Sequence, residues 1–192
     1  MSKAILFDRD GTLLVEVGYL NHPSLVVPYH FVPEALRKAR DNGYLLIAVT
    51  NQSGVARGYL TESDLSLIHE RMQDILRSKD VSLDAIYYCP HHPEGSVAAY
   101  RRACTCRKPG IALGQEAARR FRIDLESCFV IGDQETDLLF GRALDAETCL
   151  VRTGFGAAEE KRLGRAGLKT SKVFDNVLDA VGWIIEGSTD HR

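Results

Sequence analysis

The sequence has few of the features that mark membrane, secreted or nucleic-acid-binding proteins. Its longest apolar run, Tyr44 to Val49, is much shorter than the ~20 residues needed to cross a bilayer. The net charge is only −2, so neither a nucleic-acid surface nor a polybasic membrane anchor is expected. The apolar stretch near the N-terminus is too short for a signal peptide. We therefore expect a cytoplasmic protein with no nucleic-acid or membrane partner.

Cysteine is also scarce, and its odd count of five does not suit a disulfide framework in a reducing compartment. Cys128 and Cys149 lie in apolar segments and are expected to be inert buried thiols. A metal site is the better explanation for the other three, which lie near two histidines. The length of 192 residues favours a single domain, 1–192, and no amphipathic stripe is left over to predict an oligomer, so a monomer is expected.

Apolar segments alternate with amphipathic segments along the whole chain. Strands are predicted at 3–7, 45–49, 83–89, 128–131, 148–152 and 172–174. Helices are predicted at 33–43, 61–79, 112–121, 135–143, 157–166 and 177–185, and the last residues, 187–192, are expected to fray. Thr61 is expected to cap its helix, with Asp64 completing a capping box. The alternation predicts an α/β fold with a doubly wound parallel sheet of Rossmann-like type, which binds ligands beyond the carboxyl ends of its strands.

Carboxylates follow two of these strands. Asp8 and Asp10 end the segment "ILFDRDGTLL", and Asp133 and Asp137 occur in "GDQETD" after another strand. A D-x-D-G stretch on its own is most often a turn. Acids from two strand ends would meet in one crevice, however, where they need a cation, and carboxylate oxygens with open positions suit Mg²⁺.

Two further segments could bind phosphate at the same edge. "VTNQSG" offers the Thr50 hydroxyl and Asn51, although Thr-Asn after an apolar run is as often a plain turn. "CRKPG" offers Arg107 and Lys108, cations of the kind that phosphoryl transfer requires. Each stretch alone is weak evidence for phosphate binding, and the prediction depends on their occurring together with the carboxylates.

In this order, "DRDGT", "VTNQSG", "CRKP" and "GDQETD" resemble the four motifs of the haloacid dehalogenase superfamily, in its group of small phosphatases without a large cap domain. The resemblance covers nearly the whole chain. It implies a phosphoric monoester hydrolase in which Asp8 is the nucleophile and Asp10 the general acid and base. Mg²⁺ would be held by Asp8, the backbone carbonyl of Asp10 and Asp133, while Thr50 and Lys108 steady the transferred group.

The segment "CPHHPEGSVAAYRRACTCRKP" contains Cys89, His91, His92, Cys104 and Cys106. The pairs C-x-H and C-x-C are more tightly spaced than most zinc ligands, and the alternative is a set of small buried residues and surface histidines. Thiolates with an imidazole favour a closed, structural Zn²⁺ that would order the loop 89–106. The spacing does not choose between the two histidines, whereas the resemblance implies His91.

Two branches of the superfamily share the loop and the motifs: the heptose bisphosphate phosphatases and the histidinol-phosphate phosphatases. "VTNQSGVARGYL" and "YYCPHHPEG" are more similar to the heptose branch, which implies removal of the 7-phosphate of D-glycero-D-manno-heptose 1,7-bisphosphate. The substrate-binding residues expected from this resemblance are Glu16, Gly18, Tyr19, Asn51, Gln52, Ser53, Arg57, Arg107 and Gln134.

The sequence departs from the heptose branch at three places. Gly110 follows Pro109 directly, Gln134 stands where a lysine is frequent, and "SLVVPYHF" is less acidic than usual. Histidinol phosphate or another small phosphorylated metabolite therefore remains an alternative substrate. An inactive, zinc-organised binding module is the alternative of another class.

Overall fold

A six-stranded sheet forms the centre of the computed structural model, which describes residues 1–166 and 172–189. Its strand order is β3-β2-β1-β4-β5-β6, and each strand is parallel to its neighbours. The strands are β1 (Lys3–Phe7), β2 (Tyr44–Asn51), β3 (Ala85–Cys89), β4 (Phe129–Gly132), β5 (Glu147–Val151) and β6 (Val173–Phe174). The predicted α/β fold with a doubly wound parallel sheet is confirmed.

Both faces of the sheet are buried, because successive side chains of a strand point to opposite faces. In β1, Ile5 and Phe7 pack into one core cluster while Ala4 and Leu6 pack into another. β2 divides in the same way. A strand buried on both faces must be apolar at nearly every position, and β1 and β2 meet this requirement.

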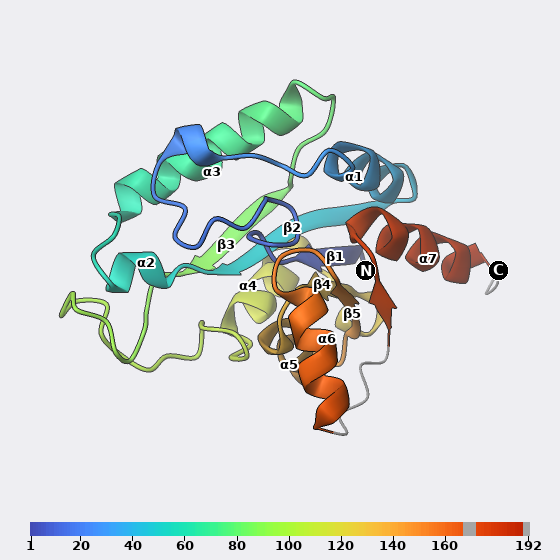
Figure 1. The fold of residues 1–192 in the computed structure, drawn as a ribbon. Helices are drawn as coiled ribbons and strands as arrows, with labels where there is room; N and C mark the ends of the chain where they lie inside the picture. Colours follow the sequence, from blue (N-terminus) through green and yellow to red (C-terminus); the bar gives the residue numbers. More distant parts are fainter. Residues whose placement is uncertain (167–171, 190–192) are drawn as a thin grey trace.

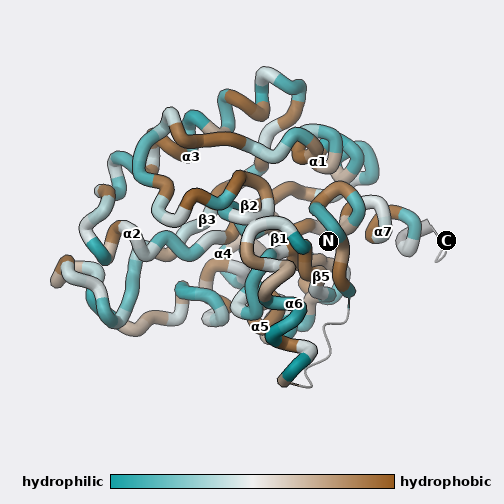
Figure 2. The backbone as a smooth tube through the Cα atoms, viewed as in Figure 1, coloured by the Kyte–Doolittle hydropathy of each residue, from teal (hydrophilic) through white to brown (hydrophobic). Residues whose placement is uncertain are grey.

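Two layers of helices cover these faces (Figure 1). Helices α1 (Val32–Asp41), α3 (Glu62–Arg77) and α7 (Val177–Thr189) contribute to the first core cluster, whereas α4 (Ala112–Phe121) and α5 (Glu135–Ala143) contribute to the second. The remaining helices are α2 (Ser53–Ala56), α6 (Gly156–Arg165), η1 (Pro23–Leu25) and η2 (Leu125–Ser127). The helices alternate between apolar and polar stretches in Figure 2, as amphipathic helices do. No helix among the described residues is long and apolar enough to cross a membrane.

The predicted elements differ from the observed ones mainly at their ends. Helices α4 and α5 have the predicted bounds, whereas α7 continues to Thr189, so the expected fraying is wrong for 187–189; residues 190–192 lie outside the described residues. Strand β2 continues beyond its apolar run because β3 pairs with it as far as Asn51 opposite Cys89. Helix α2 was not predicted, since its four residues are too few for a periodic pattern.

The chain reverses its direction of winding between β1 and β4. From β1 it proceeds to β2 and β3 on one side, and then crosses to β4, β5 and β6 on the other. Phe7 pairs with Ile131, so the residues that follow both strands emerge at the same level of the sheet. Ligands bind at such a switch point in open α/β sheets. The topology thus places Asp8 and Asp133 side by side.

Replacing Thr61 with Ala should lower the free energy of unfolding by about 1 kcal/mol. The Thr61 hydroxyl accepts a hydrogen bond from the Asp64 backbone N–H, and the Asp64 side chain accepts one from the Thr61 N–H, so the predicted capping box is confirmed. Urea unfolding would measure the loss. Thr61→Ser keeps the hydroxyl and serves as the control; an equal loss in both variants would contradict the capping role.

Candidate active site

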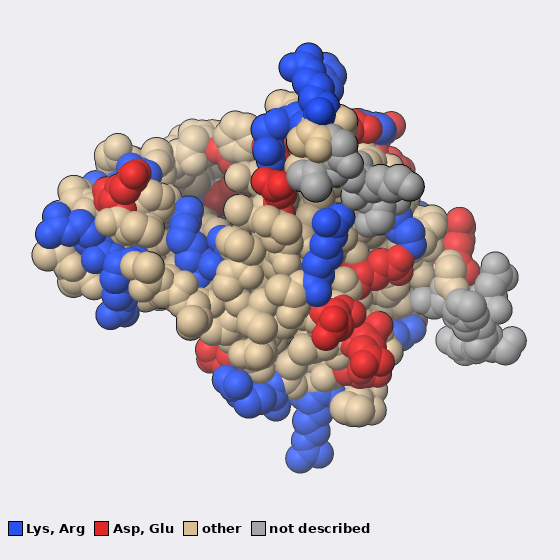
Figure 3. Space-filling view, turned by 90° about the horizontal axis from the view of Figure 1, so that it is seen from below, with Lys and Arg blue, Asp and Glu red and all other residues tan. Residues whose placement is uncertain are grey.

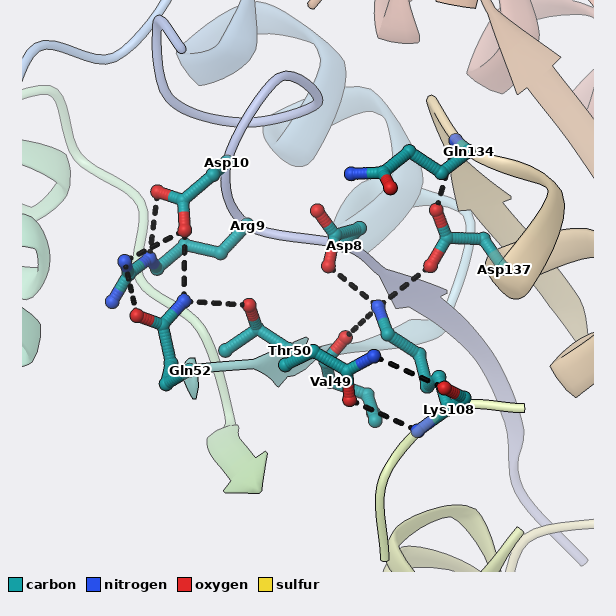
Figure 4. Close-up of polar contacts among 10 residues, drawn as sticks. Asp8, Arg9, Asp10, Val49, Thr50, Gln52, Lys108, Gln134 and Asp137 are labelled. Carbon is teal, nitrogen blue, oxygen red and sulfur yellow. Dashed lines mark hydrogen bonds and ion pairs between the residues drawn. The ribbon is translucent and has the colours of Figure 1, made fainter. Parts of the chain in front are cut away.

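Three buried carboxylates meet one buried ammonium group at the switch point. Asp8, Asp133 and Asp137 each offer an oxygen atom, and these atoms lie within 4.8 Å of one another. The Nζ atom of Lys108 lies 2.5 Å from Asp8 Oδ1 and 2.6 Å from Asp137 Oδ1 (Figure 4). It also donates a hydrogen bond to the carbonyl oxygen of Val49. The acids predicted from two strand ends are therefore brought together.

This cluster carries more negative than positive charge. Burial raises the pKa of Asp8 to about 7 and that of Asp133 to about 8, and the neighbouring carboxylates add to both shifts. Burial acts against the charge of Lys108, but Asp137 and Asp8 outweigh it, so the pKa of Lys108 is raised. One ammonium group cannot neutralise three ionised carboxylates. A further cation would relieve the repulsion that raises these pKa values.

The donor set fits Mg²⁺. Asp133 Oδ2 accepts a hydrogen bond from the Phe155 backbone N–H at 2.8 Å, while its buried Oδ1 has no hydrogen-bond partner. Gly11 and Gly154 pack against this carboxylate so closely that a Cβ atom at either would lie 2.2 Å from Oδ2. Mg²⁺ prefers hard carboxylate oxygens as ligands, and Asp133 Oδ1 is such an oxygen with no other partner.

Asp10 belongs to a second network beside the first (Figure 4). Its carboxylate accepts hydrogen bonds from Arg9 Nε at 3.0 Å and Arg9 Nη2 at 2.7 Å. Gln52 Nε2 donates both to Asp10 Oδ2 at 2.8 Å and to Thr50 Oγ1 at 2.9 Å. The side chain of Gln52 is therefore occupied in holding Asp10 and Thr50.

A cavity of about 340 Å³ opens over both networks. Eight of the nine predicted substrate-binding residues line it: Glu16, Gly18, Tyr19, Asn51, Gln52, Ser53, Arg107 and Gln134. Arg57 is the exception. It lies outside the lining, with its guanidinium 3.4 Å from His92 Nε2. Residues 15–27, which leave the sheet after β1 and return to pair Val15 with Val27, supply the part of the wall that contains Glu16 and Tyr19.

Asn51 places Lys108 in this cavity. The Lys108 backbone N–H donates to Asn51 Oδ1 at 2.9 Å, and Asn51 Nδ2 donates to the Lys108 carbonyl at 3.1 Å. Gly110 closes the turn that follows, since its N–H donates to the Arg107 carbonyl at 2.7 Å and a Cβ atom there would lie 2.4 Å from the Thr105 carbonyl oxygen. The glycine directly after Pro109 is thus required by a tight turn.

A second cluster lies in the loop between β3 and α4. Ligand atoms of Cys89, His91, Cys104 and Cys106 all lie within 4.8 Å of one another. Three sulfur pairs are 3.1, 3.2 and 3.5 Å apart, shorter than the spacing of about 3.8 Å that tetrahedral zinc with bonds of ~2.3 Å imposes, so the thiols would move apart slightly on binding the ion. His92 lies outside the cluster, and its Nδ1 accepts the Glu94 backbone N–H. The geometry agrees with the choice of His91, and the soft donors fit Zn²⁺.

Three residues of the site were missed by sequence reasoning. Glu62 joins the loop to the core by accepting hydrogen bonds from Tyr88 and Tyr100. Arg9 contacts Asp10, and His69 contacts Arg9. Charged and polar residues are ordinarily expected at the surface, so nothing in the sequence marked Arg9 as buried or Glu62 and His69 as partly buried. Arg9, enclosed between two acids of a motif, carried the best available signal.

The loop between β3 and α4 also carries basic side chains. It lies at the left end of the molecule in Figure 1, and Lys and Arg side chains gather on the same side in Figure 3. Arg101 and Arg102 are exposed, and Arg107 reaches the cavity wall. An anionic substrate would be attracted to this end.

Comparisons with known proteins agree with this geometry. A family model described as HAD-hydrolase-like matches residues 105–180. The chain is 41% identical over 152 residues to the D-glycero-beta-D-manno-heptose-1,7-bisphosphate 7-phosphatase of Escherichia coli K12, covering 79% of this chain and 80% of that one. It is 38% identical to the enzyme of the same name from Haemophilus ducreyi, covering 95% of this chain and 98% of that one. The chain belongs to the haloacid dehalogenase-like hydrolases.

A solved structure of this haloacid dehalogenase-like family has the same fold. It is the D,D-heptose 1,7-bisphosphate phosphatase from B. bronchiseptica, which was crystallised with magnesium and phosphate. The TM-score is 0.84 at 28% identity, and the match covers 97% of this chain and 99% of that one. The predicted family and the class of phosphoric monoester hydrolases are thereby confirmed.

Replacing His91 with Ala should remove bound zinc from the purified protein, whereas replacing His92 should not, because only the first imidazole lies among the thiols. Elemental analysis would count the zinc, with about one ion per wild-type chain expected. Equal zinc in both variants would contradict the assignment of His91.

Proposed function

We propose that this chain is a Mg²⁺-dependent phosphatase that removes the 7-phosphate of D-glycero-D-manno-heptose 1,7-bisphosphate through an aspartyl-phosphate intermediate. The observation that carries the proposal is the convergence of Asp8, Lys108, Asp133 and Asp137 in one buried cluster beneath the cavity. The named relatives support this substrate, and their names specify the β anomer. A cytoplasmic, single-domain monomer is part of the same proposal.

Asp8 is the nucleophile in this proposal. Lys108 holds Oδ1, so the other carboxylate oxygen is the one that attacks phosphorus. Bound at Asp8, Asp133 and the backbone carbonyl of Asp10, Mg²⁺ would supply positive charge that favours the ionised carboxylates and offsets the charge of the phosphoryl group. Lys108 adds its own charge to the same oxygens, and the Thr50 hydroxyl orients them.

Asp10 handles the proton. As the phosphorus–oxygen bond to the sugar breaks, protonated Asp10 gives its proton to the leaving oxygen, and the sugar departs as an alcohol. Asp10 then takes a proton from the water that attacks the aspartyl phosphate, which releases inorganic phosphate and restores the Asp8 carboxylate. Gln52 and Arg9 hold Asp10 in place between the two steps.

The substrate assignment is tested by comparing kcat/KM on three compounds. The value of kcat/KM should be higher for the 1,7-bisphosphate than for the 7-monophosphate or histidinol phosphate. The reason is that Arg107 and the basic loop can contact a second phosphate away from the reacting one. Both anomers of the bisphosphate should be assayed. A preference for histidinol phosphate would replace the heptose proposal with that alternative.

Asp8→Asn should abolish Mg²⁺-dependent phosphate release, reducing kcat by at least ~10³-fold, because the amide cannot form the intermediate. The change is nearly isosteric, so the thermal unfolding midpoint should stay close to or above that of the wild type. Phosphate release from an aryl phosphate provides the assay. A wild type as inert as the variant with every divalent cation would support the alternative of a zinc-organised binding module.

A further inference from the structure

Arg9 is a fully buried cation of this protein, with a side chain that is 0% exposed. Its guanidinium contacts three polar side chains: Asp10 through Nε and Nη2, Gln52 through Nη2 at 2.9 Å, and His69 through Nη1 at 3.0 Å. Arg9 thus joins the acid/base residue to helix α3, which lies outside the cavity lining.

His69 is the last member of this chain of contacts. Burial, reinforced by the charge of Arg9, lowers the pKa of His69 to about 3, so the imidazole is neutral. Arginine cannot accept a hydrogen bond, so Nε2 of His69 must be the acceptor and Nδ1 must carry the proton. The ring also packs against Tyr88 of β3, with ring centroids 5.6 Å apart. His69 is therefore held from two sides.

We propose that His69 is a positioning residue that acts through Arg9 to hold the carboxyl group of Asp10 where, once protonated, it can give its proton to the leaving oxygen. This inference rests on the proposed function, since it assumes that Asp10 is the general acid. His69 itself touches neither the cavity nor the predicted metal ligands.

The physical reason lies in the rigid geometry of the guanidinium. Its planar fork binds a carboxylate through two parallel hydrogen bonds, so turning the fork also turns the carboxylate. Without an acceptor on α3, Nη1 would be a buried donor with no partner, and Arg9 would move to satisfy it. The Asp10 carboxylate would then shift relative to the leaving oxygen while Asp8 and Lys108 stay in place.

The test compares substrates that differ in their need for a proton. An alkyl phosphate requires protonation of its leaving oxygen, whereas a nitrophenyl phosphate leaves readily without it. The ratio of kcat/KM is the correct readout, because it covers steps only as far as formation of the intermediate and so omits the later basic role of Asp10. His69→Leu should lower kcat/KM for the alkyl phosphate about tenfold more than for the aryl phosphate, a fraction of the ~10²–10⁴ that acid catalysis contributes.

His69→Gln supplies an amide oxygen near the position of Nε2 and should restore the wild-type ratio. Gln73→Leu is the matched control. Gln73 lies one turn further along α3 and makes two hydrogen bonds to the backbone of Leu83, so its loss disturbs the helix without touching Arg9. Its kcat/KM values should fall equally for both substrates or stay unchanged.

Equal losses for the two phosphates in His69→Leu, or failure of His69→Gln to recover the ratio while it remains folded, would overturn the inference. If His69→Leu does not fold, the inference is tested by comparing His69→Gln with His69→Asn. The shorter Asn side chain does not reach Arg9, so His69→Asn should show the selective loss of kcat/KM for the alkyl phosphate. A wild type that cleaves neither compound would instead refute the proposed function.

Discussion

Three buried carboxylates share one buried ammonium group at the switch point of the sheet, and the rest of the site depends on this imbalance of charge. Burial alone would favour the protonated acids, and the raised pKa values of Asp8 and Asp133 express that tendency. Lys108 opposes it but cannot cancel it. A further cation would relieve this excess of negative charge, and the proposed Mg²⁺ would be such a cation.

The surrounding structure holds this repulsive cluster together. The parallel register of β1 and β4 sets Asp8 beside Asp133, and the side chain of Asn51 fixes the backbone of Lys108 by two hydrogen bonds. Gly11 and Gly154 press on the Asp133 carboxylate from positions where no side chain would fit. Each of these contacts reduces the freedom of the charged groups to move apart, and so preorganises them for catalysis.

Asp8 and Asp10 belong to one motif and are separated by a single residue, but their side chains have different partners. Asp8 pairs with Lys108, and Asp10 pairs with Arg9 and Gln52. In the proposed mechanism one of these acids is a nucleophile and the other carries a proton, and separate cationic partners allow neighbouring carboxylates to differ in this way. The loop with the thiol cluster adds Arg107 to the same cavity, while Glu62 ties the loop to α3 and β3 through two tyrosine hydroxyls.

Local pattern in the sequence determined much of this protein. Alternation of apolar strands and capped helices predicts the sheet, because this pattern depends on residues close together in the chain. Short motifs that resemble those of the family predict the roles of Asp8, Asp10, Thr50, Lys108 and Asp133. Long-range contacts decided the rest. The pairing of Arg9 with His69 spans 60 residues, Arg57 lies beside His92 and away from the cavity, and Gln52 holds Asp10 and Thr50. A sequence shows that a side chain is polar, but only the packed structure decides which partner it meets, because burial forces each polar group to the nearest one that can satisfy it.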